Sequence, residues 1–117
     1  MKRDVAVLIT RPPYGRVHVP EGLRAARGVA AGFDRHDVTV VFTGDGVYAA
    51  RAAVDRDALN MPEHIADLHA ENGRMVADAA AMAERGIDSE EIADDIAVRS
   101  GEDVAEMIRD VDRTLDF

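Results

Sequence analysis

The sequence predicts an α/β fold, in which a mainly parallel sheet of about five strands carries helices on both faces. Several short apolar stretches lack polar alternation, which is typical of strands that are covered on both sides. These stretches alternate with segments of helical spacing, and short links join them. Such alternation favours parallel strands with crossover helices and a flavodoxin-like topology. A length of 117 residues predicts a single domain over residues 1–117.

The first strand and the first helix are expected on either side of a stiff loop. Residues 4–10, DVAVLIT, form a continuous apolar strand. The strand cannot continue through the two prolines that follow, because proline lacks an amide donor and fixes its own φ. Pro20 suits the first turn of a helix. Apolar residues then follow at helical spacing, namely Leu23, Ala26, Val29, Ala30 and Phe33.

A second strand over 38–42 leads into Thr43-Gly-Asp-Gly, and we expect a helix over 47–54. Asp45 could cap this helix by accepting amide hydrogen bonds. Alternatively, the glycine turn could cradle a phosphate against free amides at the helix start. The turn lacks the lysine of a P-loop and the spacing of a dinucleotide fingerprint. Asp45 would also place a negative charge at the anion, so the cap is the favoured interpretation.

The second half of the chain continues the alternation. A helix should begin near Pro62 and end near Asn72-Gly73. The short stretch 75–77 predicts a third strand, followed by a helix over 79–84 that closes at Gly86. Residues 88–91 resemble a cap for a short helix, 96–99 predict a fourth strand, and 114–117 predict a fifth. Between these two strands a helical stripe is formed by Val104, Met107, Ile108 and Val111.

The chain contains no cysteine, and this excludes several kinds of chemistry at once. Disulfides, thiolate metal sites, a thiol nucleophile and a persulfide carrier all require a cysteine sulfur. His64 and His69 are five residues apart, which places them on different faces of a helix. We therefore expect neither a metal site nor a cofactor.

The charge balance limits the class of partner. The net charge is −9, and a single lysine accompanies thirteen arginines. This balance repels phosphate backbones, so we expect no direct nucleic-acid binding and no membrane association. No apolar run is long enough to span a bilayer, and a cytoplasmic location is expected. The composition suggests a salt-adapted organism, or alternatively an ordinary acidic protein from a GC-rich genome.

The loop that begins Arg11-Pro-Pro-Tyr-Gly has two interpretations. It could be a rigid turn in which Tyr14 packs over the first helix. It could equally be a preformed loop that offers an arginine and an aromatic ring to a partner, because loops on rigid scaffolds often carry function. The sequence alone leaves both open.

Several motifs resemble the DsrE/DsrF-like sulfur-relay family, and within it the TusC/DsrF branch. They are Pro13-Tyr-Gly after the first strand, Glu21-Gly-Leu-Arg-Ala-Ala, and Phe42-Thr-Gly-Asp-Gly-Val-Tyr48. The segments 79–87 and 112–117 are also similar. The resemblance implies a three-layer α/β/α fold. It also implies assembly as a homo-oligomer, a trimer or hexamer, or as a hetero-oligomer with related DsrE/DsrH-like subunits.

Active members of that family carry a persulfide on a cysteine after the third strand, and this chain departs from them there. Counting back from Arg85-Gly-Ile, the cysteine position is occupied by Asp78. A carboxylate cannot form a persulfide, so no catalytic residue is assigned. Asp78 could line the same pocket as an acid or weak ligand, but an N-cap for the following helix is favoured. The expected pocket or interface residues are Arg11, Pro13, Tyr14, Gly15, Glu21, Thr43, Gly44, Asp45, Gly46, Tyr48 and Asp78.

The leading hypothesis is therefore an accessory DsrE/DsrF-like subunit that does not carry persulfide. It would assemble through the loops at 11–18 and 43–48. The alternative is a small-ligand or nucleotide-binding module with its pocket at the C-terminal strand ends, where ligands of such sheets usually bind. A hydrolytic or metal-dependent enzyme ranks last, since it would rest only on Asp45 and Asp78 sharing one edge of the sheet.

Overall fold

The computed structural model describes residues 2–32 and 34–117, so Phe33, expected on the first helix, lies outside the described residues. The strands are β1 (Asp4–Ile9), β2 (Asp37–Phe42), β3 (Arg74–Asp78), β4 (Ala97–Arg99) and β5 (Arg113–Asp116). The α-helices are α1 (His18–Ala31), α2 (Pro62–Ala70), α3 (Ala79–Glu84) and α4 (Gly101–Asp110). Two 3₁₀ helices are η1 (Gly44–Ala50) and η2 (Ser89–Glu91).

The strands form one five-stranded parallel sheet with the order β4-β3-β2-β1-β5. The predicted fold class and strand number are therefore confirmed. The order differs from the flavodoxin-like order 2-1-3-4-5. In this chain β2, β3 and β4 continue outward from β1 on one side, and β5 alone lies on the other. The flavodoxin-like topology expected from the sequence is wrong in this respect.

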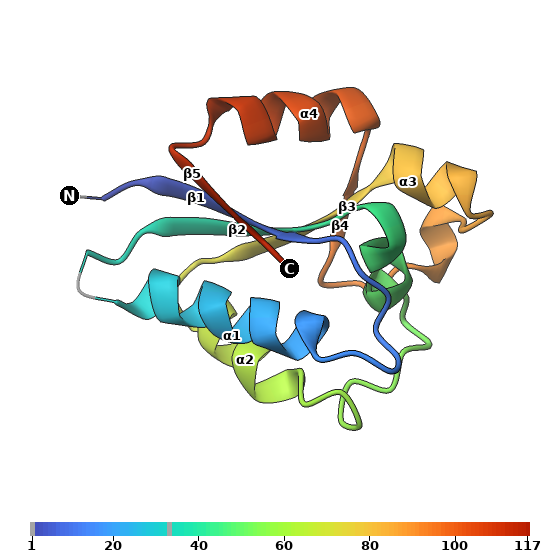
Figure 1. Cartoon of the computed structure of the whole chain (residues 1–117), viewed down its shortest axis with the longest axis horizontal. Helices are drawn as coiled ribbons and strands as arrows, with labels where there is room; N and C mark the ends of the chain where they lie inside the picture. Colours follow the sequence, from blue (N-terminus) through green and yellow to red (C-terminus); the bar gives the residue numbers. More distant parts are fainter. Residues whose placement is uncertain (1, 33) are drawn as a thin grey trace.

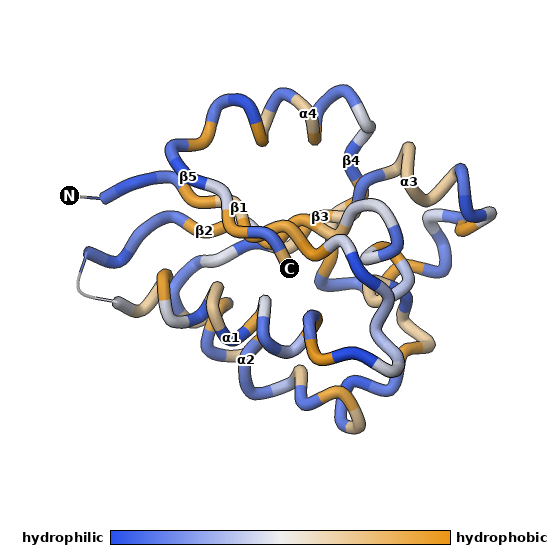
Figure 2. Tube along the Cα trace, viewed as in Figure 1, coloured by the Kyte–Doolittle hydropathy of each residue, from blue (hydrophilic) through white to orange (hydrophobic). Residues whose placement is uncertain are grey.

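Helices cover the sheet on both faces and produce three layers (Figure 1). α1 and α2 bury Leu23, Ala26, Ile65 and Leu68 against one face, where the larger core cluster lies. α4 covers the other face with Val104, which contacts Val41 and Val76. Figure 2 shows the hydrophobic residues concentrated along the strands of the middle layer. The continuous apolar patterns of β1 and β2 reflect this two-sided burial.

The segment after β2 differs from its prediction. The sequence predicted a helix over 47–54, but a 3₁₀ helix begins at Gly44, inside the turn, and ends at Ala50. Gly44 has φ +53°, a conformation that favours glycine. The amide of Gly46 then donates to the carbonyl of Thr43 at 2.9 Å, which is the i to i+3 bond of a 3₁₀ turn.

Other boundaries shift by a few residues. α1 begins at His18, so Pro20 lies in its first turn as predicted. The last strand occupies Arg113–Asp116 instead of 114–117. η2 has the predicted cap, since the Glu91 carboxylate accepts from the amide of Asp88 at 2.7 Å. Within residues 2–32 and 34–117, no helix combines the length and the apolar character needed to cross a bilayer.

Candidate functional site

The C-terminal ends of the strands bring the predicted site segments to one edge of the sheet. The amide of Thr43, after β2, donates to the carbonyl of Ile9 at 3.0 Å, and the amide of Thr10 donates to the carbonyl of Phe117 at 3.0 Å. The first bond holds the loops that follow β1 and β2 beside each other, and the second holds the end of the chain beside the end of β1. Thr43 and Asp45, which follow β2, and Asp78, which ends β3, therefore lie at the same edge of the sheet.

Asp78 is the centre of this region. Its carboxylate accepts from the hydroxyl of Thr43 at 2.7 Å and from the amide of Ala80 at 3.0 Å. The predicted N-cap of the helix at 79 is therefore confirmed. A Cβ atom added to Gly101 would lie 3.6 Å from the Asp78 carboxylate, so the start of α4 approaches the same group. Asp78 thus links the ends of β2 and β3 with α3, close to the start of α4.

Asp45 has a different role from the one predicted. The position that caps η1 is held by Thr43, whose side chain makes no capping bond to η1, and Asp45 lies inside that helix. Its carboxylate instead accepts from Nε of Arg85 at 2.9 Å. This hydrogen bond raises the pKa of Arg85 above its ordinary value. The prediction of Asp45 as an N-cap is wrong, because the helix starts earlier than its apolar pattern indicates.

Close backbone packing sets the shape of the glycine turn. A Cβ atom on Gly46 would lie 1.8 Å from the carbonyl oxygen of Ile9, so only glycine fits there. The amide of Gly46 is already bonded to Thr43. A phosphate cradle needs free amides that point at the anion. The amide of Gly46 is therefore not free for an anion, and the turn packs tightly against the end of β1.

Tyr48 and Arg51 form a pair on the outer side of η1. The Arg51 guanidinium lies 5.1 Å from the centre of the Tyr48 ring, and its Nε donates to the carbonyl of Tyr48 at 2.9 Å. A cation over an aromatic face within about 6 Å is attracted to the ring. The pair holds Tyr48 half-buried against the core.

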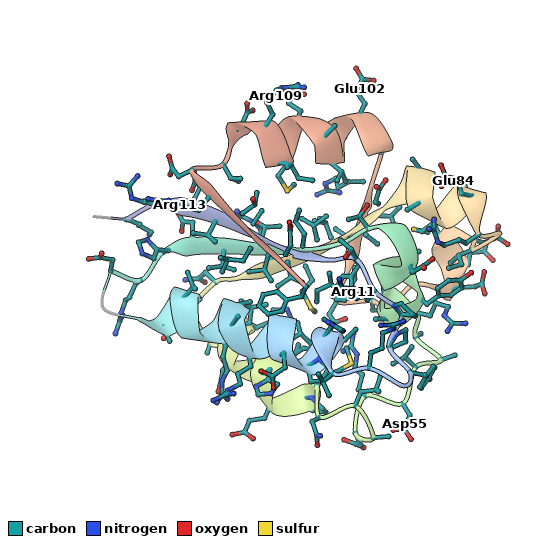
Figure 3. The ribbon with its side chains drawn as sticks, in the orientation of Figure 1. Arg11, Asp55, Glu84, Glu102, Arg109 and Arg113 are labelled. Carbon is teal, nitrogen blue, oxygen red and sulfur yellow. The ribbon has the colours of Figure 1, made fainter. Side chains whose placement is uncertain are left out.

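The loop after β1 combines a buried anchor with exposed side chains. Pro13 is fully buried, whereas 56% of Tyr14 and 67% of Val17 are exposed. Tyr14 is therefore more than half exposed, which favours the second interpretation, a loop that offers its side chains to a partner. Gly15 has φ +73°, which favours glycine at this bend. Figure 3 places Arg11 near η1 and the start of α1, at the C-terminal end of the sheet.

Glu21 lies on the exposed side of α1, where its carboxylate pairs with the guanidinium of Arg24 at 3.6 Å. This ion pair stays within one helix face, so the structure does not join Glu21 to the group around Asp78.

A comparison with protein-family models matches residues 3–117 to the DsrE/DsrF-like family. The chain belongs to the DsrE/DsrF-like family. Among solved structures it is similar to the YchN protein of Escherichia coli, with 22% identity, full coverage of both chains and a TM-score of 0.77. It is also similar to MTH1491 of Methanobacterium thermoautotrophicum, a protein of unknown function, with 19% identity, 92% and 90% coverage and a TM-score of 0.70. A search of curated proteins found no match.

Two residues of this candidate site were missed in the sequence. Arg85 is forty positions from Asp45, and no local pattern connects them. Arg51 is three positions after Tyr48, and this spacing could have indicated a pair on one helical face. Arg85 also donates to the carbonyl of Ala81 at 3.0 Å, so it joins α3 to η1.

A separate hollow lies at the opposite end of the strands. It has a volume of about 290 Å³ and is lined by Asp4, Asp37, Thr39, Arg74 and Met107, between α4 and the sheet. Its position gives no support to a ligand pocket at the C-terminal strand ends. In the part of the chain that the structure describes, no three His, Cys, Asp or Glu side chains are arranged to hold a metal ion.

Proposed function

We propose that this chain is an accessory, non-persulfide-carrying subunit of an oligomeric sulfur-relay assembly. Membership of the DsrE/DsrF-like family supports a role of this type. The observation that carries the proposal is Asp78, which stands where the family resemblance implies a carrier cysteine. Its carboxylate is engaged as a cap and as an acceptor for Thr43. No cysteine elsewhere in the chain could replace the missing sulfur.

The same proposal assigns the assembly surface to the loops at 11–18 and 43–48. Tyr14 and Val17 are large apolar side chains exposed on a loop that Pro13 anchors. A stiff loop loses little conformational entropy when it binds, which favours a protein interface. The partner is a second copy or a related DsrE/DsrH-like subunit, in the manner of the TusC/DsrF branch.

Light scattering in high salt tests the assembly, since salt screens the repulsion between acidic chains. The expected result is an oligomer at micromolar concentration, alone or mixed with a related cysteine-bearing subunit. Tyr14→Ser should weaken this assembly, whereas Arg109→Ser, on α4, should not. A strict monomer under every condition would contradict the assembly, and covalent sulfur uptake by the wild-type chain would contradict the non-carrier role.

A further inference from the structure

β5 is a free edge of the sheet. It pairs with β1 on one side, and it is the last strand in the order on the other. All four residues of β5 are exposed, including Leu115 at 37%. Figure 1 shows β5 crossing in front of the other strands, with no helix drawn over it in that view. An uncovered edge strand is a template for pairing with another chain.

The unpaired backbone groups of β5 can be assigned from the bonds at its end. The amide of Phe117 donates to Leu8 at 2.8 Å, and the carbonyl of Phe117 accepts from Thr10 at 3.0 Å. Both polar groups of Phe117 therefore face β1. Because these groups alternate sides along a strand, those of Leu115 also face β1. The amides and carbonyls of Thr114 and Asp116 then point outward from the sheet.

We propose that two copies of this chain pair antiparallel through β5, with Leu115 opposite the partner's Leu115. In this register Thr114 lies opposite the partner's Asp116. Each such pair exchanges two N–H···O=C bonds, so all the outward groups of both residues are satisfied. Leu115 forms the central pair without mutual hydrogen bonds, where the two Cα atoms are about 4.5 Å apart and the side chains meet. The contact joins two five-stranded sheets into one.

The hydrogen bonds and charges of the strand select this register. Moving the centre to Thr114 would leave a single hydrogen-bonded pair, Thr114 with its own copy, because the amide of Asp112 faces β1 and donates to the carbonyl of Asp4 at 2.9 Å. Moving it to Asp116 would place that carboxylate opposite its own copy. Like charges directly opposite each other destabilise a strand pair. With Leu115 at the centre, Thr114 supplies a hydroxyl donor opposite the carboxylate of the partner's Asp116.

Cysteine crosslinking gives a direct test, because the chain has no cysteine of its own. In the proposed dimer, cysteines at 115 would be about 4.5 Å apart between Cα atoms, within the range for a disulfide. Cysteines at 114 would be diagonal neighbours at roughly 7–8 Å, too far apart to bridge. Leu115→Cys should therefore form a crosslinked dimer roughly tenfold faster than Thr114→Cys under mild oxidation. Equal rates for the two variants would overturn the proposed register.

A proline variant tests the dimer without relying on a disulfide. The amide of Thr114 faces outward, and proline is tolerated on edge strands at such positions. Thr114→Pro should keep the far-UV circular dichroism of the wild type. Its sedimentation coefficient should fall to that of a single copy, because the contact between the two β5 strands is lost. Thr114→Ser keeps the amide and should sediment like the wild type. A wild-type chain that binds an unrelated strand peptide along β5 but shows no self-pairing would overturn the proposal.

This contact does not depend on the proposed function. Val17→Ser alters the loop at 11–18, and Thr114→Pro alters only β5. If Val17→Ser reduces assembly while Leu115→Cys fails to crosslink, the loop interface stands and the β5 pair is refuted. If Leu115→Cys crosslinks and Val17→Ser assembles like the wild type, the β5 pair stands and the loop interface is refuted.

Discussion

Replacing Gly46 by alanine should strongly destabilise the fold, although it adds only one methyl group. The new Cβ atom would lie 1.8 Å from the carbonyl oxygen of Ile9 and 2.5 Å from its carbonyl carbon, so it would clash with main-chain atoms. Reaching 3.0 Å, below which Cβ contacts essentially never occur, requires a shift of 1.2 Å. The methyl group cannot escape by rotating, because both partners belong to the main chain.

The cost follows from what this shift disturbs. Overpacking a tight site costs about 1–3 kcal/mol. The carbonyl of Ile9 also accepts from the amide of Thr43 at 3.0 Å, and losing that bond costs about 1 kcal/mol more. We therefore expect Gly46→Ala to lower the free energy of unfolding by about 2–4 kcal/mol. That is a large share of the roughly 5–15 kcal/mol typical of a domain.

Gly28→Ala is the matched control. Gly28 lies on α1, and a Cβ atom there would meet nothing within 4 Å. The substitution should stabilise the helix by about 0.5–1 kcal/mol. Urea unfolding at pH 7 measures both variants. A free energy of unfolding for Gly46→Ala within about 0.5 kcal/mol of the wild type would refute the close packing between β1 and η1.

Three further results are expected. Asp78→Ala should lower the free energy of unfolding by about 1–2 kcal/mol, and Asp78→Asn, which keeps an acceptor, by less than half of that; equal losses in urea unfolding would contradict the cap. The hydrogen bond from Arg56 lowers the pKa of Asp95 below its ordinary 3.8, so this pair stabilises the fold above that value and the gain is lost as pH falls through the lowered pKa; Arg56→Met should cost about 1 kcal/mol at pH 7, and a cost that does not shrink in acid would count against the assignment. Tyr14→Ser should change stability by less than about 0.5 kcal/mol in thermal unfolding, because more than half of the residue is already exposed, and a larger loss would mean that the ring packs on the fold.

The layers of the fold could be predicted from local patterns. The unbroken apolar runs of β1 and β2 reflect burial on both faces, and the stripe containing Val104 reflects one helix face. Strand order could not be predicted in the same way. The position of β5 beside β1 depends on where α4 crosses the sheet. All four residues of β5 are exposed, so the strand has no apolar pattern from which this position could be predicted.

In the candidate site, too, contacts between near neighbours in sequence could be predicted and contacts between distant residues could not. The cap at Asp78 was predictable, because it bonds to amides two and three residues ahead of it. The role of Asp45 was not, because its partner Arg85 lies just beyond a different helix. The burial of Pro13 and the exposure of Tyr14 are opposite outcomes for neighbours in one loop. Local sequence therefore identified the segments that meet at this edge, but not which side chains pair there.

The measurement that tests the proposed function most directly is sulfur transfer to Asp78→Cys. Asp78 is proposed to occupy the carrier position, so that its side chain is the reason the chain carries no persulfide. A cysteine at 78 would have the Ala80 amide within reach of its sulfur, and such amides favour the reactive thiolate. With a labelled persulfide donor, the wild type should take up no covalent label, and Asp78→Cys should take up far more than Gly28→Cys, an exposed control. Labelling of Asp78→Cys no greater than that of Gly28→Cys would contradict the account.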